Sequence, residues 1–354
     1  MPFFSIIIPV YNAEKTIEHC LNSCLNQTYK NIEIICIDDC STDASLFVLK
    51  KYTAKDQRIR CISLESNVNL YMARKIGMQN IQGDYVLFLD SDDTFQLDAC
   101  EILSNEIAKN PTDIIHFGYI KNNDRKLIFQ PILPTCQDYI LAFLTKNQRI
   151  SPAVWSRAYS NALIKYAIQV TGDFQAFMAE DVYYSIVFYY LAKTISFIDK
   201  TLIIYSDGGG SHSEIFDSAR YIAWLKSYSV IAKQIQAFIT SYIPEYAEYC
   251  IDVQVRFLED FLGRIPKNIS TSSKNEIIEL INTYYMPQTL FLYIEKLQKK
   301  EEKYNYYFAF DISIKQQIRK IFKLQLFVFS KSVNVISAIM RKILKHMKLC
   351  LFSQ

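Results

Sequence analysis

Two clusters of acidic residues are the part of this sequence best suited to chemistry. One cluster contains Asp38 and Asp39, and the other contains Asp90, Asp92 and Asp93. Carboxylate oxygens are the ligands that hard divalent cations such as Mg²⁺ and Mn²⁺ prefer in proteins. Aspartate-rich turns also cap helices and accept local hydrogen bonds, so either cluster taken alone fits a structural role equally well. The position of the clusters in the fold therefore decides between the two interpretations.

Each acidic cluster comes directly after a short apolar run, in a part of the chain where such runs alternate with helical patterns. The pattern predicts strands over residues 3–9, 32–38, 59–64, 85–90 and 113–119, with helices near 14–26, 44–55, 70–80 and 97–109. Short apolar strands separated by helices predict an α/β fold whose mainly parallel sheet is covered on both faces. Ligands of such sheets bind beyond the carboxyl ends of the strands, so both clusters are expected at the binding edge.

Length and composition predict two structural parts. The chain has 354 residues, more than a usual single domain, and 50% of them are hydrophobic, which excludes intrinsic disorder. From about Phe216 onward the pattern changes to long helical stretches, after a glycine-rich turn at residues 208–213. We therefore expect an α/β catalytic domain over residues 1–215 and an α-helical region over residues 216–354.

The last part of the helical region, residues 312–354, is strongly basic. It contains no Asp or Glu but nine Lys or Arg residues, and its apolar residues form one stripe on a helical wheel. This pattern predicts a basic amphipathic helix that binds an anionic membrane surface. Packing on the rest of the chain and formation of a homodimer are the alternatives, and the apolar stripe makes nucleic-acid binding a poorer fit. The segment Ile321–Met340 is interrupted by lysines and is not expected to span a membrane.

The cysteines and the N-terminal segment indicate a cytoplasmic location. Nine cysteines without a C-x-x-C pair suggest neither a disulfide framework nor a zinc ribbon, and reduced thiols fit the cytosol. The apolar run Phe3–Val10 has no basic region before it and contains Pro9, so it predicts a strand and not a signal peptide.

Several motifs occur in the order and approximate spacing of one enzyme family. They are PVYN (9–12), LNQTY (25–29), DDCSTD (38–43), NVNLYMARKIG (67–77), GDYVLFLDSDD (83–93), VWSRAY (154–159) and MAEDVYY (178–184). Together they closely resemble glycosyltransferase family 2 over residues 3–213, and the ordered set is far more specific than any one motif. The resemblance implies a GT-A fold with a Rossmann-like nucleotide-binding sheet, a nucleotide-diphospho-sugar donor, Mn²⁺ or Mg²⁺, and inversion at the anomeric carbon. Cys40 and Asn69 replace family glycines and Lys75 replaces an asparagine, so altered loop geometry is expected there.

The resemblance also implies the residues of the donor site. Asp39 is expected to accept a hydrogen bond from uracil N3, and Asp90 from the ribose hydroxyls. Asp92 is the expected metal ligand. Arg74 is expected to neutralise phosphate, because a guanidinium is a permanent planar donor, and a surface salt bridge is its alternative role. The other donor-site residues are Pro9, Tyr11 and Asn12, which would frame the base, and Ser91.

The resemblance also implies Asp181, in a segment similar to the family's E-D motif, as the general base. Inversion needs such a group opposite the leaving group to take the proton of the acceptor hydroxyl. Glu180 beside it is expected to position the acceptor, and simple capping of a helix is the alternative for both. Trp155 and Arg157 are expected to line the sugar pocket, although a lone tryptophan is more often a core residue. His212 follows a run of glycines and is expected to contact metal or phosphate.

These expectations add up to a metal-dependent transferase of a hexose or N-acetylhexosamine from a UDP-sugar. The motifs around Trp155 and Asp181 resemble those of lipo-oligosaccharide β-1,3-galactosyltransferases, so UDP-galactose is the first donor to test. The expected acceptor is a glycan or lipid-linked oligosaccharide at the inner face of the cytoplasmic membrane. An inactive glycan- or nucleotide-binding scaffold is the alternative from another class. A nucleotidyltransferase fits less well, because PVYNAEKT lacks a glycine- and lysine-rich phosphate loop.

Overall fold

The structure is a computed structural model that describes residues 1–121, 126–129, 131–145, 150–206, 218–264, 279 and 281. The chain forms two compact units, Met1–Pro266 and Lys267–Gln354, and every element named below lies in the first. Among the described residues, no helix is long and apolar enough to cross a membrane. The predicted basic tail at residues 312–354 lies outside the described residues.

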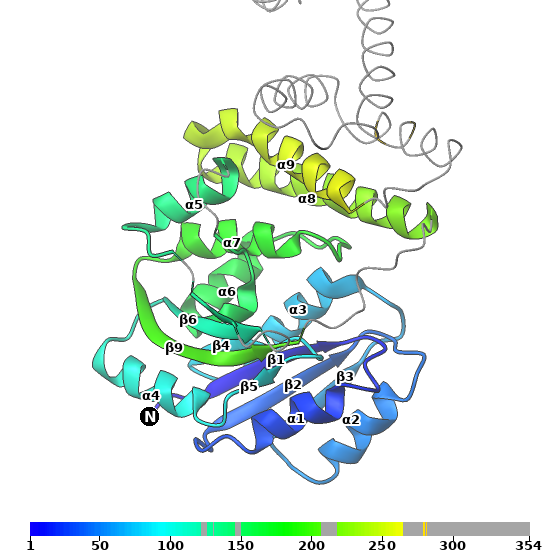
Figure 1. Ribbon diagram of the computed structural model, residues 1–354, viewed down its shortest axis with the longest axis vertical. Coiled ribbons are helices and arrows are strands. Elements are labelled where there is room, and N and C mark those ends of the chain that lie inside the picture. Colours follow the sequence, from blue (N-terminus) through cyan, green and yellow to red (C-terminus); the bar gives the residue numbers. More distant parts are fainter. Residues whose placement is uncertain are drawn as a thin grey trace, which may run out of the picture. The chain divides into compact units, whose positions relative to one another are not determined.

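A nine-stranded mixed sheet forms the centre of the first unit (Figure 1). Its strands are β1 (Phe4–Val10), β2 (Ile32–Asp38), β3 (Ile59–Ser63), β4 (Tyr85–Phe88), β5 (Thr94–Phe95), β6 (Ile114–Lys121), β7 (Lys126–Ile128), β8 (Arg157–Ser160) and β9 (Ile195–Tyr205). Their order is β3-β2-β1-β4-β8-β6-β9-β5, and β7 pairs with β6. The first four strands are parallel, as predicted, whereas β8 is antiparallel to both β4 and β6. The prediction of an α/β fold is confirmed, and the parallel pairing expected for its sheet is found among β1 to β4.

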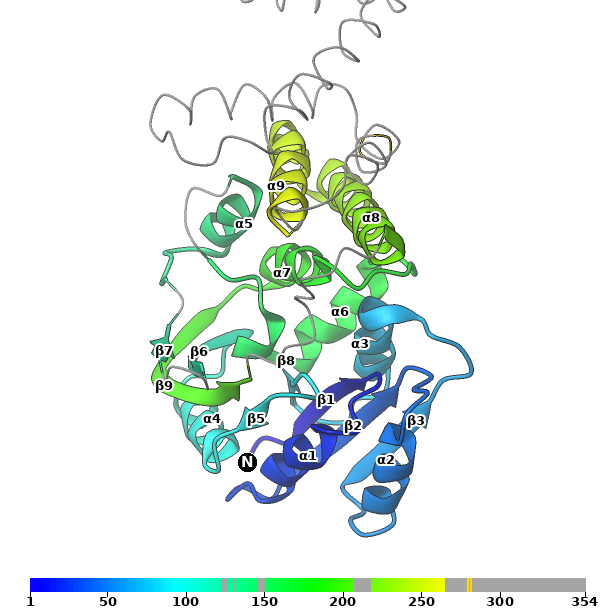
Figure 2. The ribbon, with the colours of Figure 1, turned by 45° about the vertical axis from the view of Figure 1, so that its right-hand side comes forward.

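Helices cover both faces of this sheet. They are α1 (Ile17–Leu25), α2 (Ser45–Thr53), α3 (Asn69–Gln79), α4 (Ala99–Lys109), α5 (Cys136–Thr145), α6 (Asn161–Val170), α7 (Glu180–Leu191), α8 (Ser218–Tyr242) and α9 (Cys250–Gly263), with short 3₁₀ helices η1 (Val154–Ser156) and η2 (Pro244–Tyr249). Figures 1 and 2 show α1 and α2 on one face and α3 and α6 on the other. The four helices expected before residue 110 are therefore confirmed.

The parallel strands are buried because both of their faces are covered. Every residue of β1 and of β2 is buried, including the isoleucines that dominate both strands. Burying an isoleucine side chain contributes about 1.5–3 kcal/mol relative to leaving it exposed. A continuous apolar run, without polar alternation, is the pattern that such a strand requires. The sequence of these strands thus determines that they lie inside the sheet and not at its edge.

The direction of the chain across the sheet reverses at β1. The chain passes from β1 to β2 and β3 on one side and then returns through α3 to β4 on the other side of β1. Because crossovers between parallel strands are right-handed, this reversal places α3 on the opposite face from α1 and α2. A crevice is expected between the loops at the carboxyl ends of β1 and β4, since the connections there diverge.

Two residues that replace family glycines adopt the backbone conformation that favours glycine. Cys40 has φ 60° and Asn69 has φ 69°. A side chain in this left-handed region costs about 1–2 kcal/mol, although asparagine tolerates it better than most residues. The φ angles of these two residues therefore show no change from a glycine-type backbone. The altered loop geometry expected in the turns after β2 and before α3 is not seen in these angles.

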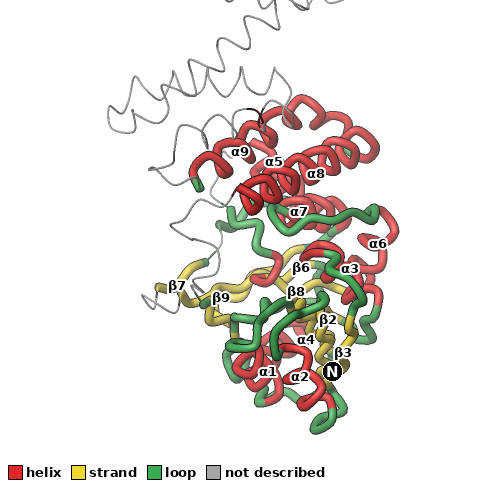
Figure 3. The backbone as a smooth tube through the Cα atoms, turned by 90° about the vertical axis from the view of Figure 1, so that its right-hand side faces the viewer, coloured by secondary structure: helices red, strands yellow, loops and turns green. Residues whose placement is uncertain are grey.

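The helices α8 and α9, which follow residue 216, pack within the first unit against α5 and α7. Figure 3 shows α5, α7, α8 and α9 gathered on one side of the strands, with α1 and α2 on the other. Contacts join α7 to α8, α8 to α9, and α9 to α5. The helical character expected from Phe216 onward is thus seen in α8 and α9. The glycine-rich turn where the domain boundary was placed lies outside the described residues, so that boundary stays a prediction.

Candidate active site

A pocket of about 480 Å³ opens beyond the carboxyl ends of β1, β2 and β4. This is the edge of the sheet where the reversal of chain direction predicts a ligand site. The pocket is lined by Pro9, Val10, Tyr11, Asp39, Asn67, Asn69, Leu70, Ala73, Asp90, Ser91, Asp92 and Phe177. Both acidic clusters of the sequence therefore contribute to one pocket.

Asp39 follows β2, and its carboxylate is held by the start of α3. The backbone N–H of Val68 donates to Asp39 Oδ1 at 2.6 Å, and that of Asn69 donates to Oδ2 at 2.9 Å. Burial raises the pKa of Asp39, while these two hydrogen bonds lower it. Each carboxylate oxygen can accept a further hydrogen bond, so Asp39 remains able to bind a ligand N–H. Its bond to uracil N3 stays a prediction.

The loop after β1 supplies an exposed aromatic ring to the same pocket. Pro9 and Tyr11 both line the pocket, and Tyr11 is 52% exposed. Asn12 does not line the pocket but fastens this loop to the one after β2. Its Oδ1 accepts from the backbone N–H of Thr42 at 2.8 Å, and its own N–H donates to Ser41 Oγ at 3.1 Å. The ring of Tyr11 is thus held where it can stack on a planar base.

Asp92 is the carboxylate of the second cluster best placed to bind a cation. It lines the pocket beside Asp90 and Ser91. Burial and then the charge of Asp90 raise the pKa of Asp92, and a bound cation would reverse both effects. Among the described residues, no group of three or more His, Cys, Asp or Glu side chains could hold a metal. Asp92 therefore fits Mg²⁺ or Mn²⁺ bound partly through water and ligand phosphates, as Mg²⁺ commonly is.

Asp93, the last acid of this cluster, is part of the support for the site. It is fully buried, and its Oδ1 accepts from the backbone N–H of Ser206 at 2.8 Å. Burial, followed by the charge of Asp90, raises the pKa of Asp93 to about 8. This hydrogen bond ties the acidic turn after β4 to the end of β9, immediately before residues 207–217.

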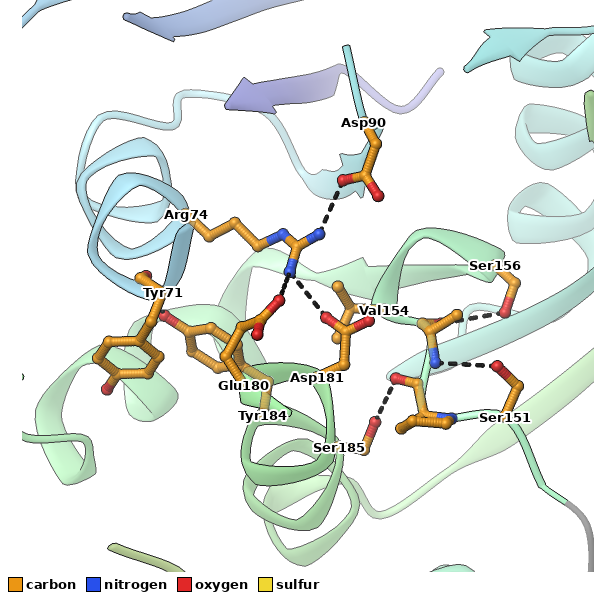
Figure 4. A network of polar contacts seen from close by, with 12 residues as sticks. Tyr71, Arg74, Asp90, Ser151, Val154, Ser156, Glu180, Asp181, Tyr184 and Ser185 are labelled. Atoms are coloured by element: carbon orange, nitrogen blue, oxygen red, sulfur yellow. Dashed lines mark hydrogen bonds and ion pairs between the residues drawn. The ribbon is translucent and has the colours of Figure 1, made fainter. Parts of the chain in front are cut away.

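Arg74 joins the donor pocket to the predicted catalytic carboxylates (Figure 4). Its Nη2 forms an ion pair with Asp90 at 2.7 Å, and its Nη1 contacts both Glu180 at 2.8 Å and Asp181 at 2.7 Å. The arginine side chain is only 1% exposed. Three carboxylates from two distant parts of the sequence therefore share one buried guanidinium. The predicted contact of Arg74 with phosphate stays a prediction.

Asp181 is partly buried and reaches solvent at the start of α7. Its side chain is 22% exposed, compared with 6% for Glu180. Burial raises the pKa of Asp181 above its ordinary value, against the positive charges of Arg74 and Arg157. A carboxylate with a raised pKa is a stronger base than an exposed one, as a general base for a hydroxyl requires. Asp181 and Asp90 thus contact the same guanidinium group, that of Arg74.

Glu180 makes the stability of the folded chain depend on pH. Burial, and then the charge of Asp181, raises the pKa of Glu180 to about 7 from an ordinary value of 4.5. Between these two values the folded state binds a proton that the unfolded state has lost, so stability falls as pH rises. Below pH 4.5 both states are protonated, and above about 7 both are ionised, so the loss is then complete.

We therefore expect Glu180→Gln to raise the melting temperature more at pH 8 than at pH 5. Glutamine resembles the protonated acid and does not titrate. The gain in melting temperature should be larger at pH 8 by at least about 2 °C, which corresponds to roughly 1 kcal/mol in a chain of this size. Calorimetry at both pH values measures it, with the exposed Glu245→Gln as control. An equal gain at both pH values would contradict the raised pKa.

Trp155 and Arg157 lie behind the pocket and not among the residues that line it. The ring of Trp155 stacks on Tyr205 with centroids 5.3 Å apart. Arg157 is fully buried and donates to the hydroxyl of Tyr189 at 2.9 Å and to the carbonyl of Ala153 at 2.7 Å. Their contact with sugar stays a prediction, whereas the charge of Arg157 acts on Asp181. His212 lies outside the described residues.

Six pocket residues did not figure among the candidates from the sequence: Val10, Asn67, Asn69, Leu70, Ala73 and Phe177. Val10 ends β1, and the next four lie in or next to α3, within the same motif as Arg74. Helical spacing from Arg74 could have indicated Leu70. Phe177 comes from the segment between α6 and α7, where no local pattern distinguishes a pocket aromatic from a core aromatic. Only the packing of that segment against α3 reveals it.

Comparison with known proteins identifies the first half of the chain. Residues 5–170 match the family model described as glycosyl transferase family 2. GlyA of Streptococcus pneumoniae is 32% identical over 224 residues, which cover 60% of this chain and 32% of GlyA. EpsJ of Bacillus subtilis, an uncharacterized glycosyltransferase, is 31% identical over 222 residues, which cover 61% of this chain and 64% of EpsJ. The chain thus spans less than two thirds of these relatives.

The fold is shared with a solved structure that contains a bound nucleotide sugar. The crystal structure of Staphylococcus aureus TarS 1-349 in complex with UDP-GlcNAc superposes with a TM-score of 0.62 at 21% sequence identity, covering 91% of this chain and 92% of TarS 1-349. At this identity the likeness establishes the fold alone. Residues 5–170 thus match glycosyltransferase family 2, and the chain has the fold of TarS 1-349, a domain of GT-A type.

Proposed function

We propose that the chain is an inverting, metal-dependent glycosyltransferase that moves one sugar from a UDP-sugar to a glycan acceptor. The observation that carries this proposal is the position of Asp181. Arg74 holds it 2.7 Å from Nη1, while Nη2 of the same guanidinium holds Asp90 at the wall of the donor pocket. An inverting transfer needs this arrangement, with a base next to the pocket that receives the donor.

Four residues of the pocket and the two acids at the start of α7 have a part in the proposed reaction. Asp39 and Tyr11 would bind the uracil base, and Asp90 the ribose. Asp92 would hold Mg²⁺ or Mn²⁺, which stabilises the charge that develops on the leaving diphosphate. Asp181 would take the proton of the acceptor hydroxyl as its oxygen attacks the anomeric carbon. Glu180 would orient the acceptor from the buried side of Asp181.

The donor and acceptor are proposed at the level of chemical class. UDP-galactose is the first candidate, followed by UDP-N-acetylhexosamines and UDP-glucose. The TarS structure with bound UDP-GlcNAc adds weight to the N-acetylhexosamines. The proposed acceptor is a bacterial surface glycan or a lipid-linked oligosaccharide. Residues 312–354 would hold the enzyme at the inner face of the cytoplasmic membrane, since each basic residue near an anionic leaflet contributes about 1 kcal/mol.

Release of UDP tests the proposal directly. The full chain is incubated with each UDP-sugar and Mn²⁺ or Mg²⁺, with and without a glycan acceptor, and UDP is measured. We expect turnover with at least one donor, complete loss on adding EDTA, and recovery on restoring the cation. EDTA already saturated with Mg²⁺ is the control for effects of the chelator itself. Binding of UDP without turnover of any donor, with acceptors present, would favour the inactive scaffold.

A further inference from the structure

The segment 171–179, between α6 and α7, connects two parts of the site. It carries Phe177 into the lining of the pocket, and it ends where Glu180 and Asp181 begin α7. It contains no regular secondary structure, so its own backbone hydrogen bonds do not fix its shape. The position of Asp181 therefore depends on what holds this segment from outside, as well as on its ion pair with Arg74.

Helix α3 holds the first part of the segment. The ammonium group of Lys75 donates to the carbonyl of Thr171 at 2.6 Å and to that of Gly172 at 3.1 Å. The hydroxyl of Tyr71 also donates to Gly172 O at 2.8 Å, and its ring stacks on Phe174 with centroids 3.8 Å apart. Tyr71 and Lys75 lie one turn apart on α3, next to Arg74. The backbone N–H of Tyr71 also donates to Ala176 O at 2.9 Å, so the contacts of α3 reach the residue before Phe177 and leave Phe177 and Met178 to other partners.

A single serine of α8 holds the last part of the segment. The backbone N–H groups of Phe177 and Met178 donate to Ser227 Oγ at 3.1 and 3.0 Å, and the Ser227 hydroxyl is 3.2 Å from Met178 O, to which it donates. A hydroxyl can accept two hydrogen bonds and donate one, so all its capacity is used here. Ser227 is only 4% exposed, and hydrogen bonds in such a place are not replaced by water.

The turn into α7 has no side-chain cap of its own. Ala179 is the N-cap residue of α7, lies in the left-handed region with φ 64°, and has no side chain that could accept a helix N–H. Alanine is a poor N-cap, and this conformation is unfavourable for it. Support for the turn must therefore come from neighbouring residues, and the hydroxyl of Ser227 bonds the two residues immediately before it.

We propose that Ser227 is a positioning residue of the active site, which fixes Phe177 in the pocket wall and Asp181 in its catalytic orientation. The inference rests on the proposed role of Asp181 as the general base. It gives the helical region after residue 216 a direct part in catalysis, because a hydroxyl of α8 sets the geometry at the start of α7. Ser227 does not itself line the pocket or bond a carboxylate; it reaches the pocket through the backbone of Phe177.

The test compares Ser227→Ala with Ser227→Thr, which keeps the hydroxyl. We expect the alanine variant to lower kcat about 10- to 100-fold, since an error of about 1 Å in placing a catalytic group has this effect. Its Kd for UDP should change by less than about threefold, because the base-binding side of the pocket belongs to β1, β2 and α3. Ser227→Thr should recover kcat to within about threefold of the native chain.

Amide hydrogen exchange provides a readout that does not depend on turnover. Peptides covering residues 176–183 should exchange at least about tenfold faster in Ser227→Ala, with Thr240→Ala, an exposed hydroxyl of the same helix, as the matched control. Should Ser227→Ala unfold, Ser227→Cys, with a weak hydrogen-bonding thiol of similar size, carries the same comparison. A kcat within about twofold of the native value, unchanged exchange, or equal losses in the alanine and threonine variants would overturn the proposal.

The two proposals fail in different ways. If the native chain releases no UDP from any donor, or if Asp181→Asn retains turnover, the proposed function is wrong, and the exchange of residues 176–183 still decides whether Ser227 holds this turn. If the native chain is active and Asp181→Asn is not, but Ser227→Ala matches the native chain, only the role of Ser227 is wrong.

Discussion

Replacing Asp181 by asparagine is expected to lower kcat about 10²- to 10⁴-fold, the contribution of a well-placed general base. Asparagine has nearly the same shape but cannot take a proton from the acceptor hydroxyl. The ion pair at 2.7 Å from Arg74 becomes a neutral hydrogen bond, while Arg74 keeps Asp90 and Glu180 as partners. The donor pocket is therefore expected to stay intact, and Kd for UDP should change by less than about threefold.

The pH dependence of the native enzyme adds a second measurement on the same group. The base works in its ionised form, and burial raises the pKa of Asp181. As pH falls through that pKa, kcat/KM should fall, and the decline should begin at a higher pH than an ordinary aspartate would give. Asp199→Asn, which alters an exposed carboxylate of β9, is the matched control and should leave kcat unchanged. Near-native turnover by Asp181→Asn would exclude Asp181 as the base.

Replacing Arg74 by alanine is expected to lower the free energy of unfolding by about 3–5 kcal/mol, as when one partner of a buried ion pair is removed. The change leaves the carboxylates of Asp90, Glu180 and Asp181 close together with no cation between them. Arg74→Lys should recover only part of the loss, because one ammonium group cannot reproduce the planar spread of two terminal nitrogens. Urea denaturation at pH 8 measures these differences.

Two comparisons make the Arg74 experiment decisive. Lys51→Ala disrupts a surface pair with Glu18, whose atoms are 3.8 Å apart, and should cost at most about 1 kcal/mol. In the Glu180→Gln background, the loss caused by Arg74→Ala should be smaller, since one of the three repelling charges is absent. Two results would contradict the statement that Arg74 offsets the repulsion among the three carboxylates. One is a loss below about 1 kcal/mol for Arg74→Ala, and the other is the same loss in both backgrounds.

Much of the fold follows from local sequence. The apolar runs of β1 and β2, the helical patterns of α1 to α4 and the Asp-rich turns after β2 and β4 each depend on residues close together in the chain. Their alternation predicts a parallel sheet and the edge at which Asp39 and Asp92 meet. What could not be predicted is the second half of the sheet, because β8 inserts antiparallel between β4 and β6 through pairings between distant residues.

The same distinction applies to the site. The motifs single out Asp90, Asp92 and Asp181 as candidates from residue type and order. The partners of Arg74, in contrast, depend on which residues the fold places next to α3, and these include the start of α7. The sequence suggested phosphate or a surface ion pair. The folded chain instead buries this guanidinium among three carboxylates, of which Asp181 lies 107 residues from Arg74 in the sequence. The role of Ser227 is of the same kind, since a serine within a helix carries no local signal.

By itself, the sequence determined the parallel half of the sheet, the edge where ligands bind and the acidic residues placed there, because those properties depend on local periodicity and on the turns after strands. Only the tertiary structure decided which charges pair, that Arg157 is buried behind the pocket, and which residues support the turn before Asp181. These depend on burial and on distances between remote segments. Burial is what makes each of these contacts strong, because water no longer competes for them.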